Sequence, residues 1–239
     1  MKFICIVPVY NEDKRLQALL EEINYVKTLH KNLDFIIIDN GSDDSSSKII
    51  SNFEIKNIKF EKNFGVGYAL MSGLKYAIKH DYEAIIHLAG NGKMKPIEIS
   101  NFINKIEIDN FDFVNGSRFL PNGVYSTNPI QRVILIKILS KIISIIYKKE
   151  ITDATCGYRA FKVNIFKELI KFVDKKEFYT YKYEYYSIGK ILINKKIKFC
   201  EIPVTMDYTK KNYSKIKPVI DWFPIIFGWL QAFFDGKKF

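Results

Sequence analysis

Two polar segments that follow apolar runs carry side chains suited to a nucleotide. The segment PVYNE begins at Pro8 and offers the flat ring of Tyr10 for a base and the carboxylate of Glu12 for ribose hydroxyl groups. The segment DNGSDD begins at Asp39, whose carboxylate can accept a hydrogen bond from a base imide N–H. Uracil is the simplest fit, and guanine stays open because it presents a similar N–H. The plainer alternative is that Pro8 ends a strand, Glu12 begins a helix and Asp39 opens a polar turn.

A third polar segment, AGNGK, also follows an apolar run. Asn91 offers one neutral oxygen and Lys93 a positive charge, while Ala89 and Gly90 offer only backbone groups close to a ligand. A fixed cation stabilises the negative charge that develops on a departing diphosphate. The alternative is that Lys93, like Lys95, is one more solvated charge in a lysine-rich chain.

The elements that must position these segments follow from hydrophobic periodicity. Short β-branched runs alternate with stretches of helical spacing over residues 13–29, 65–78 and 96–108. This order predicts an α/β fold with a mainly parallel central sheet flanked by helices. Such a sheet binds ligands at the carboxyl ends of its strands, where all three polar segments fall. The runs predicted as strands are FICIV, LDFIIID, NIKFE, EAIIHLA and FDFVNGS.

The composition indicates one α/β domain with an anionic partner. The chain has 239 residues, of which 48% are hydrophobic, enough for a large core. Its 37 Lys and Arg exceed 26 Asp and Glu, and the net charge of +11 favours a nucleotide, a nucleic acid or an acidic membrane surface. Because the lysines are dispersed and no nucleic-acid motif is present, nucleic acid is not expected. Three distant cysteines, Cys5, Cys156 and Cys200, predict neither a disulfide framework nor a zinc site and fit a reducing cytosol.

Histidines and glycines predict structural roles. His30, His80 and His87 lack metal-ligand spacing, so we expect the first two at the surface and His87 in packing at a strand end. The segment NFGVGYAL lacks the Gly-Lys-Ser/Thr ending of a P-loop. Gly65 and Gly67 are therefore expected to permit a tight turn from strand to helix near the nucleotide.

A set of motifs runs through nearly the whole chain: VPVYNE, IIIDNGSDDS, NFGVGYALMSGLKYA, NGSRF, DATCGYRAF, EIPV and SKIKPVID. In this order they resemble glycosyltransferase family 2, in particular its dolichol-phosphate mannose synthase-like branch. The resemblance implies a GT-A fold, a nucleotide-diphosphate sugar donor and transfer with inversion at the anomeric carbon.

The AGNGK segment, here called the donor loop, departs from the pattern of that family. The family has Asp-x-Asp-x-Gln at this place, and its acidic side chains hold a divalent cation against the donor diphosphate. Both carboxylates are absent here. We therefore expect Lys93, with Asn91 beside it, to compensate the diphosphate charge in place of a metal ion. No cofactor is therefore expected, and the use of Mg²⁺ or Mn²⁺ is the alternative that stays open.

Three arginines match arginines of the family. Arg118 in GSRF and Arg132 in PIQRV correspond to residues that the family associates with a lipid-phosphate acceptor, and Arg159 lies in CGYRAF. A guanidinium group suits phosphate because it offers a planar fork of donors. The alternative is that each arginine caps a helix or pairs with an acid such as Asp153.

The segment DYTKKNYSKIKP resembles the mobile acceptor loop of the family. It adds Lys210, Ser214 and Lys215 to the expected acceptor-phosphate residues. Lys210 and Asn212 stand where many relatives have an arginine and a glycine, so the detail of this loop differs.

A phosphate acceptor explains why no obvious general base is present. A phosphate monoester has a second pKa of about 6, so it is largely ionised at neutral pH and attacks without losing a proton. For a hydroxyl acceptor, Asp153 or Glu184 would be the carboxylates to consider. Asp153 is therefore a candidate catalytic residue together with Lys93 and Asn91.

Residues 1–217 are predicted to form the GT-A domain and residues 218–239 an apolar and basic tail. The segment WFPIIFGWLQAFF, followed by Lys237 and Lys238, is typical of an interfacial membrane segment. The alternatives that stay open for this segment are a packing helix and a homodimer contact. The segment is shorter than the roughly 20 residues of a membrane-spanning helix. A second apolar run, VILIKILSKIISIIY, is interrupted by lysines, so neither run is expected to span a membrane.

The sequence thus predicts an enzyme that transfers a sugar, with a UDP-sugar expected, to a polyprenyl phosphate at the cytoplasmic face of a membrane. The competing class is a catalytically inactive nucleotide-binding or scaffold protein derived from such an enzyme.

Overall fold

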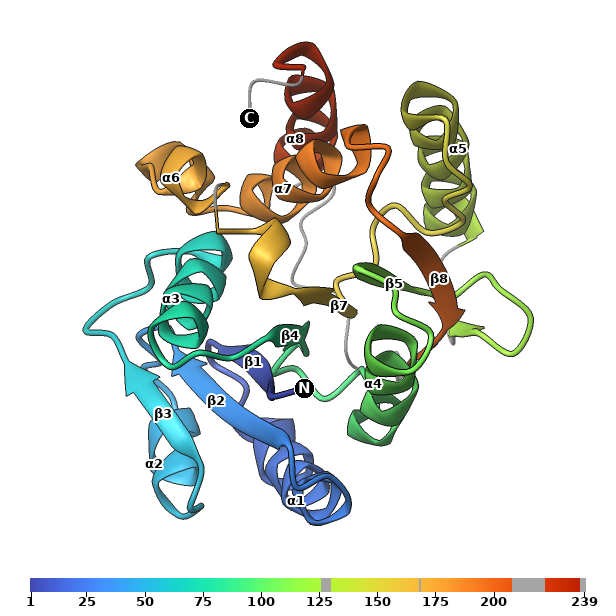
Figure 1. The fold of residues 1–239 in the computed structure, drawn as a ribbon. Helices are drawn as coiled ribbons and strands as arrows, with labels where there is room; N and C mark the ends of the chain where they lie inside the picture. Colours follow the sequence, from blue (N-terminus) through green and yellow to red (C-terminus); the bar gives the residue numbers. More distant parts are fainter. Residues whose placement is uncertain (126–129, 168, 208–221, 237–239) are drawn as a thin grey trace.

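A computed structural model describes residues 1–125, 130–167, 169–207 and 222–236. Within these residues, a seven-stranded sheet has the order β3-β2-β1-β4-β7-β5-β8 (Figure 1). Neighbouring strands are parallel except at β7, which is antiparallel to β4 and β5. The predicted mainly parallel sheet is confirmed, and the periodicity missed β7 and β8. The strands are β1 (Phe3–Val9), β2 (Leu33–Asp39), β3 (Lys56–Lys59), β4 (Ala84–His87), β5 (Phe113–Ser117), β7 (Arg159–Lys162) and β8 (Phe199–Pro203).

The central strands are buried on both faces, which explains their continuous apolar runs. Successive residues of β1 point to opposite faces, so Ile4 and Ile6 join one hydrophobic core while Cys5 and Val7 join the other. The first core is covered by α3 (Val66–Lys79), α5 (Ile130–Tyr147), α6 (Ile170–Val173), α7 (Lys182–Ile193) and α8 (Trp222–Phe234).

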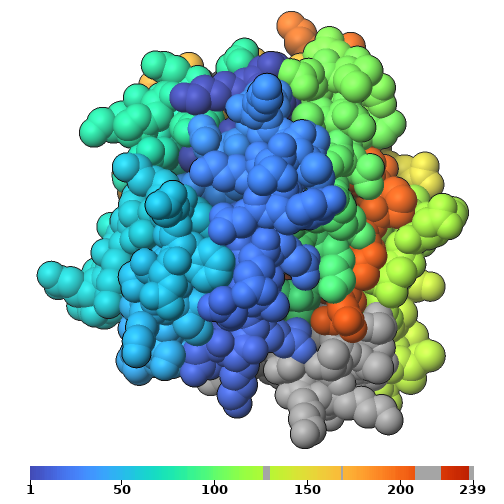
Figure 2. All heavy atoms as spheres, turned by 90° about the horizontal axis from the view of Figure 1, so that it is seen from below, coloured from blue at the N-terminus to red at the C-terminus, as the bar shows by residue number. Residues whose placement is uncertain are grey.

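The second core is covered by α1 (Asp13–Leu29), α2 (Ser46–Ser51) and α4 (Ile99–Glu107). Figure 2 shows this side from below, with the blue N-terminal segments beside the green segment that contains α4. The predicted helices over residues 13–29 and 65–78 are confirmed as α1 and α3. The one predicted over residues 96–108 is divided into the short 3₁₀ helix η1 (Pro96–Glu98) and α4, because Pro96 begins a turn of its own.

Short elements connect the donor loop to the end of the sheet. Strands β6 (Val124–Tyr125) and β9 (Thr205–Met206) form a two-stranded parallel sheet. Met94 forms an isolated bridge with Met206, and the Asp207 N–H donates to the Lys93 carbonyl at 3.0 Å. The end of the donor loop, at Lys93 and Met94, is therefore held against Met206 and Asp207. Two further 3₁₀ turns are η2 (Val163–Ile165) and η3 (Lys176–Phe178).

Helix α8 packs on α7 through small residues. A methyl group added at Gly189 would lie 2.5 Å from the Tyr147 hydroxyl oxygen and 2.6 Å from the Ala232 Cβ. The Tyr147 hydroxyl donates to the Trp229 carbonyl at 2.6 Å, which ties α5 to α8. One face of the WFPIIFGWLQAFF segment therefore lies in the core. The predicted boundary at residue 218 falls outside the described residues.

The described helices include none that combines the length and apolar character needed to cross a membrane.

We expect Gly189→Ala to weaken the packing of α8 on α7. The added methyl group cannot be accommodated without displacing Tyr147 or Ala232, so the free energy of unfolding should fall by about 1–3 kcal/mol, measured by urea denaturation. Ser187→Ala is the matched control on the same helix. It removes a buried hydroxyl that has no hydrogen-bond partner among the described residues, so stability should not fall. Equal losses for both variants would contradict this account.

Candidate active site

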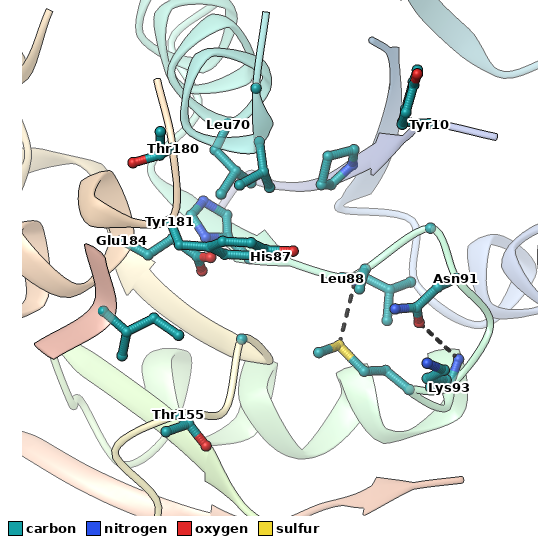
Figure 3. A pocket seen from close by; sticks show the side chains of 18 of the residues that line it. Tyr10, Leu70, His87, Leu88, Asn91, Lys93, Thr155, Thr180, Tyr181 and Glu184 are labelled. Carbon is teal, nitrogen blue, oxygen red and sulfur yellow. Dashed lines mark hydrogen bonds between the residues drawn. The ribbon is translucent and has the colours of Figure 1, made fainter. Parts of the chain in front are cut away.

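The described residues surround a cavity of about 480 Å³ at the carboxyl ends of β1 and β4 (Figure 3). Its wall includes Pro8 at the end of β1, Asn40 directly after β2 and His87 at the end of β4. The donor loop follows β4 and also lines the cavity. The three polar segments identified in the sequence therefore meet at one edge of the sheet, as expected for parallel strands.

The side of the cavity near β1 carries groups suited to a nucleoside. Tyr10 and Glu12 line it together with two asparagines, Asn40 and Asn63. The Asn40 amide donates to the Asn63 side-chain oxygen at 3.0 Å, which holds the two side chains together. Neither asparagine is among the candidate site residues that the sequence predicts. Asn40 had a local signal, since it directly follows the end of a strand, whereas Asn63 is brought there only by the fold.

Asp39 lies behind this wall, and its side chain is 2% exposed. One carboxylate oxygen accepts the Ser42 N–H at 3.0 Å, and the other accepts the Ser47 hydroxyl. These hydrogen bonds are typical of a polar turn, which is the structural role given above as the alternative to nucleotide binding. Each oxygen has a second lone pair, so the recognition of a base by Asp39 stays a prediction.

The donor loop brings Lys93 to the cavity. Ala89, Gly90 and Asn91 line it as well, and Gly90 lies so close to β1 that an added methyl group would be 2.6 Å from the Pro8 carbonyl oxygen. Lys93 is buried with 6% exposure. The alternative that Lys93 is a solvated surface charge is therefore wrong.

The donor loop does not fit a divalent cation. Asn91 supplies its one side-chain oxygen, and that oxygen accepts the Lys93 N–H at 3.1 Å. Hard divalent cations require several oxygen ligands, with carboxylates prominent among them. Across the described ranges, no group of three His, Cys, Asp or Glu side chains could hold a metal ion. The metal that the family resemblance implies has no suitable ligand set at this loop.

Gly65 and Gly67 allow another segment to approach α3. Gly65 has a positive φ of 98°, and a methyl group on it would be 2.1 Å from the Tyr179 carbonyl oxygen. A methyl group on Gly67 would be 2.1 Å from the Phe178 carbonyl oxygen, and the Gly67 N–H donates to Tyr179 O at 2.9 Å. Gly65 lines the cavity and Gly67 does not. Gly67 is required for this packing, and the place of both glycines beside the nucleotide stays a prediction.

Arg118 forms a buried ion pair with Asp153. Its Nε and Nη2 lie 2.5 and 2.6 Å from the two carboxylate oxygens, and Nη2 also donates to the Thr155 hydroxyl at 2.6 Å. Arg118 lines the cavity, with Nη1 3.6 Å from the Met206 sulfur, whereas Asp153 is fully buried and does not line it. The sequence had left open that one of the arginines pairs with Asp153, and Arg118 does so.

The pair fixes the charge of Asp153. Burial by itself raises the pKa of this carboxyl group, but the Arg118 charge and hydrogen bonds outweigh burial and hold the pKa below its ordinary value. The oxygens of Asp153 are bound to Arg118 and Thr155 behind the cavity wall, and its catalytic role stays a prediction.

Arg159 lies behind the cavity wall as well. The antiparallel pairing of β7 with β4 places it opposite His87, and its guanidinium donates to the Cys156 carbonyl. Its Nη1 is 3.6 Å from the Glu184 carboxylate, and the residue is 2% exposed. Arg159 does not line the cavity, and the expectation that it joins Arg118 and Arg132 at an acceptor phosphate stays a prediction. Because β7 is antiparallel to β4, its first residue, Arg159, lies level with His87 at the end of β4, and the periodicity missed this strand.

Glu184 and His87 line the cavity in front of Arg159. Burial raises the pKa of Glu184, and the Arg159 charge opposes this only in part. Burial and then the Arg159 charge lower the pKa of His87 to about 3. The ring of His87 packs edge-on against Phe161 at 5.0 Å, so the predicted packing role at a strand end is confirmed. His87 is neutral near pH 7 and is therefore unsuited to act as a general base.

Arg132 is the predicted acceptor arginine that lines the cavity from α5. It lies in a part of the wall that also contains Ile136 of α5 and Trp222 and Ile225 of α8. This part combines one guanidinium group with apolar surface. The remaining predicted acceptor residues lie outside the described residues: Lys210, Ser214 and Lys215.

The pKa of His87 predicts a pH-dependent stability. An unfolded chain binds a proton at this histidine below about pH 6.5, whereas the folded protein does so only near pH 3. The unfolded state thus holds more protons between these values, so stability falls as the pH drops from 7.5 to 5. Over that range His87 should account for about 2 kcal/mol of the lost unfolding free energy.

The measurement is urea denaturation at both pH values. His87→Phe should abolish this part of the pH dependence, and His80→Gln, which retains His87, should keep it. The same slope in His87→Phe and the parent would show that His87 is not buried in its neutral form.

Known proteins provide an independent comparison. Residues 4–170 match the family described as Glycosyl transferase family 2. The chain is 27% identical over 244 residues to a UDP-N-acetylglucosamine–dolichyl-phosphate N-acetylglucosaminyltransferase of Methanococcus voltae, covering 95% of this chain and 94% of that protein. It is 21% identical over 220 residues to a polyprenol monophosphomannose synthase of Mycolicibacterium smegmatis, covering 89% of this chain and 80% of that protein.

The fold is similar to a solved structure of glucosyl-3-phosphoglycerate synthase from Mycobacterium tuberculosis in complex with Mn²⁺, UDP-glucose and phosphoglyceric acid. The TM-score is 0.65 at 11% identity, covering 98% of this chain and 79% of that one. This similarity supports the GT-A fold alone. The matched family covers most of the sequence and agrees with the order of the motifs and with the sheet. The chain is therefore a glycosyltransferase and belongs to glycosyltransferase family 2, in its dolichol-phosphate mannose synthase-like branch.

Proposed function

We propose that this enzyme transfers a sugar from a nucleotide-diphosphate donor, with uridine as the expected nucleoside, to a polyprenyl phosphate. Transfer would invert the anomeric carbon and would not require a divalent metal ion. The observation that carries the proposal is the make-up of the cavity wall, which has Lys93 in the donor loop and Arg132 beside apolar residues of α5 and α8. Two relatives support this acceptor class, because one is named for transfer to dolichyl phosphate and the other for the synthesis of polyprenol monophosphomannose.

The acceptor phosphate would be its own nucleophile. One of its oxygens forms a bond to the anomeric carbon while the bond from that carbon to the diphosphate breaks on the opposite face. This in-line displacement inverts the anomeric carbon and releases a nucleoside diphosphate. No proton is removed, because the phosphate is already largely ionised near pH 7. The neutral His87 and the buried Asp153 are consistent with a reaction that needs no general base.

Lys93 would stabilise the negative charge on the departing diphosphate. It is buried, it lines the cavity, and its backbone is held by Asn91 and by Asp207. A cation that is already in position needs no reorganisation as the charge develops. Asn91 would keep the loop in shape through its hydrogen bond to the Lys93 N–H, which is a positioning role.

Arg132 would bind the acceptor phosphate, and Arg118 would contribute through Nη1. The other guanidinium atoms of Arg118 are occupied by Asp153 and Thr155, so Arg132 is the principal candidate. Ile136 and Ile225 offer apolar surface next to Arg132 for the first part of a lipid chain. A phosphate that is attached to an isoprenoid matches this combination of charge and apolar contact.

The outer faces of α5 and α8 would contact the membrane on its cytoplasmic side. Both helices expose large apolar side chains, and α5 also exposes Lys137 and Lys141, which suit anionic lipid head groups. Large apolar side chains exposed in this number on two helices are unusual on a protein surrounded only by water. The exposed residues are Ile130, Ile134, Leu135, Ile138, Ile142, Ile145, Phe223, Ile226, Phe227, Phe233 and Phe234.

We expect transfer activity to survive exhaustive chelation and to depend on Lys93. The assay follows a labelled sugar from its nucleotide donor to polyprenyl phosphate in the presence of EDTA. Lys93→Ala should lower kcat about a hundredfold, because it removes a preorganised charge. Lys95→Ala is the matched control, since Lys95 is two residues away, half-buried and not part of the cavity wall. A strict requirement for Mg²⁺ or Mn²⁺, with Lys93→Ala nearly as active as the parent, would refute the role of Lys93.

The membrane contact predicts a loss of liposome binding in the double variant Phe223→Ser and Phe234→Ser. These side chains are 71% and 80% exposed, so their replacement should leave the fold intact. Binding to anionic liposomes, measured by sedimentation, should weaken about tenfold or more because two aromatic groups no longer enter the interface.

Ile108→Ser is the control for that experiment. Ile108 is 73% exposed and follows α4, which covers the opposite face of the sheet. Its replacement should leave liposome binding unchanged. If the parent protein ignores anionic liposomes at moderate salt, the α5 and α8 surface has another partner.

A further inference from the structure

One side of the cavity is not used by the nucleotide or by the acceptor phosphate in the proposed function. Figure 3 shows Tyr10 and Asn91 on one side of the pocket and Glu184, Tyr181 and His87 on the other. All of these residues line the same cavity. A nucleoside near Tyr10 and a diphosphate near the donor loop would leave the Glu184 side for the group attached to the diphosphate.

Glu184 offers this side a carboxylate. Its nearest charged partner is Arg159, whose Nη1 lies 3.6 Å from Oε1, and the carboxylate has no hydrogen bond within the described part of the chain. A carboxylate has about four lone-pair sites and can accept hydrogen bonds from two hydroxyl groups at once. Glu184 therefore has unused capacity to accept hydrogen bonds from a ligand.

Gly157 keeps the space in front of this carboxylate open. A methyl group added at Gly157 would lie 3.8 Å from Glu184 Oε1 and 3.6 Å from the Met94 Cε, both ordinary contact distances. Gly157 also lines the cavity. An alanine would fit there without a clash and would fill the space that faces the carboxylate.

A third part of this side of the cavity, formed by Thr180 and Tyr181, follows a segment that is packed tightly against α3. The backbone of residues 178–180 lies against Gly65 and Gly67, where a methyl group would clash with it, and the Tyr68 and Tyr179 rings are 4.7 Å apart. Thr180 and Tyr181 directly follow this contact and line the cavity. Their position is thus fixed before any ligand binds, which lowers the entropic cost of recognition.

We propose that Gly157, Thr180, Tyr181 and Glu184 form the subsite for the donor sugar. Glu184 accepts hydrogen bonds from sugar hydroxyl groups, the Gly157 gap admits the ring, and Thr180 and Tyr181 form the wall beside it. The class of sugar is one that presents hydroxyl groups, not a carboxylate, because a second carboxylate at Glu184 would be repelled. This inference rests on the proposed nucleotide-sugar donor.

The test compares sugar-bearing and sugar-free nucleotides by calorimetry on the full chain. The parent protein is titrated with UDP, GDP and a panel of UDP- and GDP-linked hexoses, including UDP-glucose and UDP-glucuronate. For the best-bound nucleotide sugar, Glu184→Gln should weaken binding about tenfold or more, since a hydrogen bond to a charged group is lost. The affinity for the free nucleoside diphosphate should not change. UDP-glucuronate should bind more weakly than UDP-glucose.

Gly157→Ala is a second variant that changes no charge. It should also weaken binding of the nucleotide sugar and spare the nucleoside diphosphate, and its melting temperature should match that of the parent. Glu177→Gln is the matched control, because Glu177 precedes the same helix, has a half-exposed side chain and does not line the cavity. It should bind every nucleotide as the parent does.

The outcomes separate this inference from the function on which it rests. If the parent binds no nucleotide or nucleotide sugar, the proposed donor is wrong and the sugar subsite falls with it. A different result refutes the subsite alone. In that case the parent binds nucleotide sugars, but Glu184→Gln and Gly157→Ala either weaken the binding of nucleotide sugars and nucleoside diphosphates equally or weaken the binding of neither. Equal binding of UDP-glucuronate and UDP-glucose would refute the assigned class of sugar.

Discussion

The shape of the cavity depends on the buried ion pair between Arg118 and Asp153. Arg118 follows β5 and Asp153 precedes β7, so the pair fastens two loops to each other. Removing both charges from water costs free energy that is offset only when the buried groups are well hydrogen-bonded. Asp153 meets that condition through the Arg118 side chain, the Arg118 N–H and Thr155. The loop that carries Thr155 and Gly157 into the cavity wall is held in place as a result.

Polar groups of the family motifs divide into those that hold the wall and those that form it. Behind the wall, Glu201 accepts hydrogen bonds from Thr152 and Asn115 and joins β5 to the loop before β7. On the wall, Lys93 and Glu184 face a shared space with charges of opposite sign. In the function that we propose, this separation lets one cavity offer a cation to a diphosphate and a carboxylate to hydroxyl groups. A motif residue that pairs in the interior therefore contributes to function by fixing its neighbours.

Helices α5 and α8 have apolar side chains on both their inner and outer faces. Ile136 and Ile225 are buried and line the cavity, while Phe223 and Ile138 on the same helices are exposed. A helix that is apolar all round is ordinarily surrounded by protein or lipid. The same two helices thus carry an apolar exterior and a part of the cavity wall that includes Arg132, which suits the half-charged, half-lipid acceptor that we propose.

The sequence by itself determined strands β1 to β5, helices α1 and α3, and the family, because apolar periodicity and motif order are local properties of the chain. It also determined that the donor loop lacks carboxylates. Only the tertiary structure decided which charged residues reach the cavity: Arg159 is buried in the central strand β7, Asp153 is buried in its pair with Arg118, and Lys93 is enclosed at the cavity wall. A charge looks the same in the sequence whether it is solvated, paired or facing a ligand, since these differ only in contacts made by residues distant in the chain. Asn63, Gly157 and the role of Gly67 were hidden for the same reason.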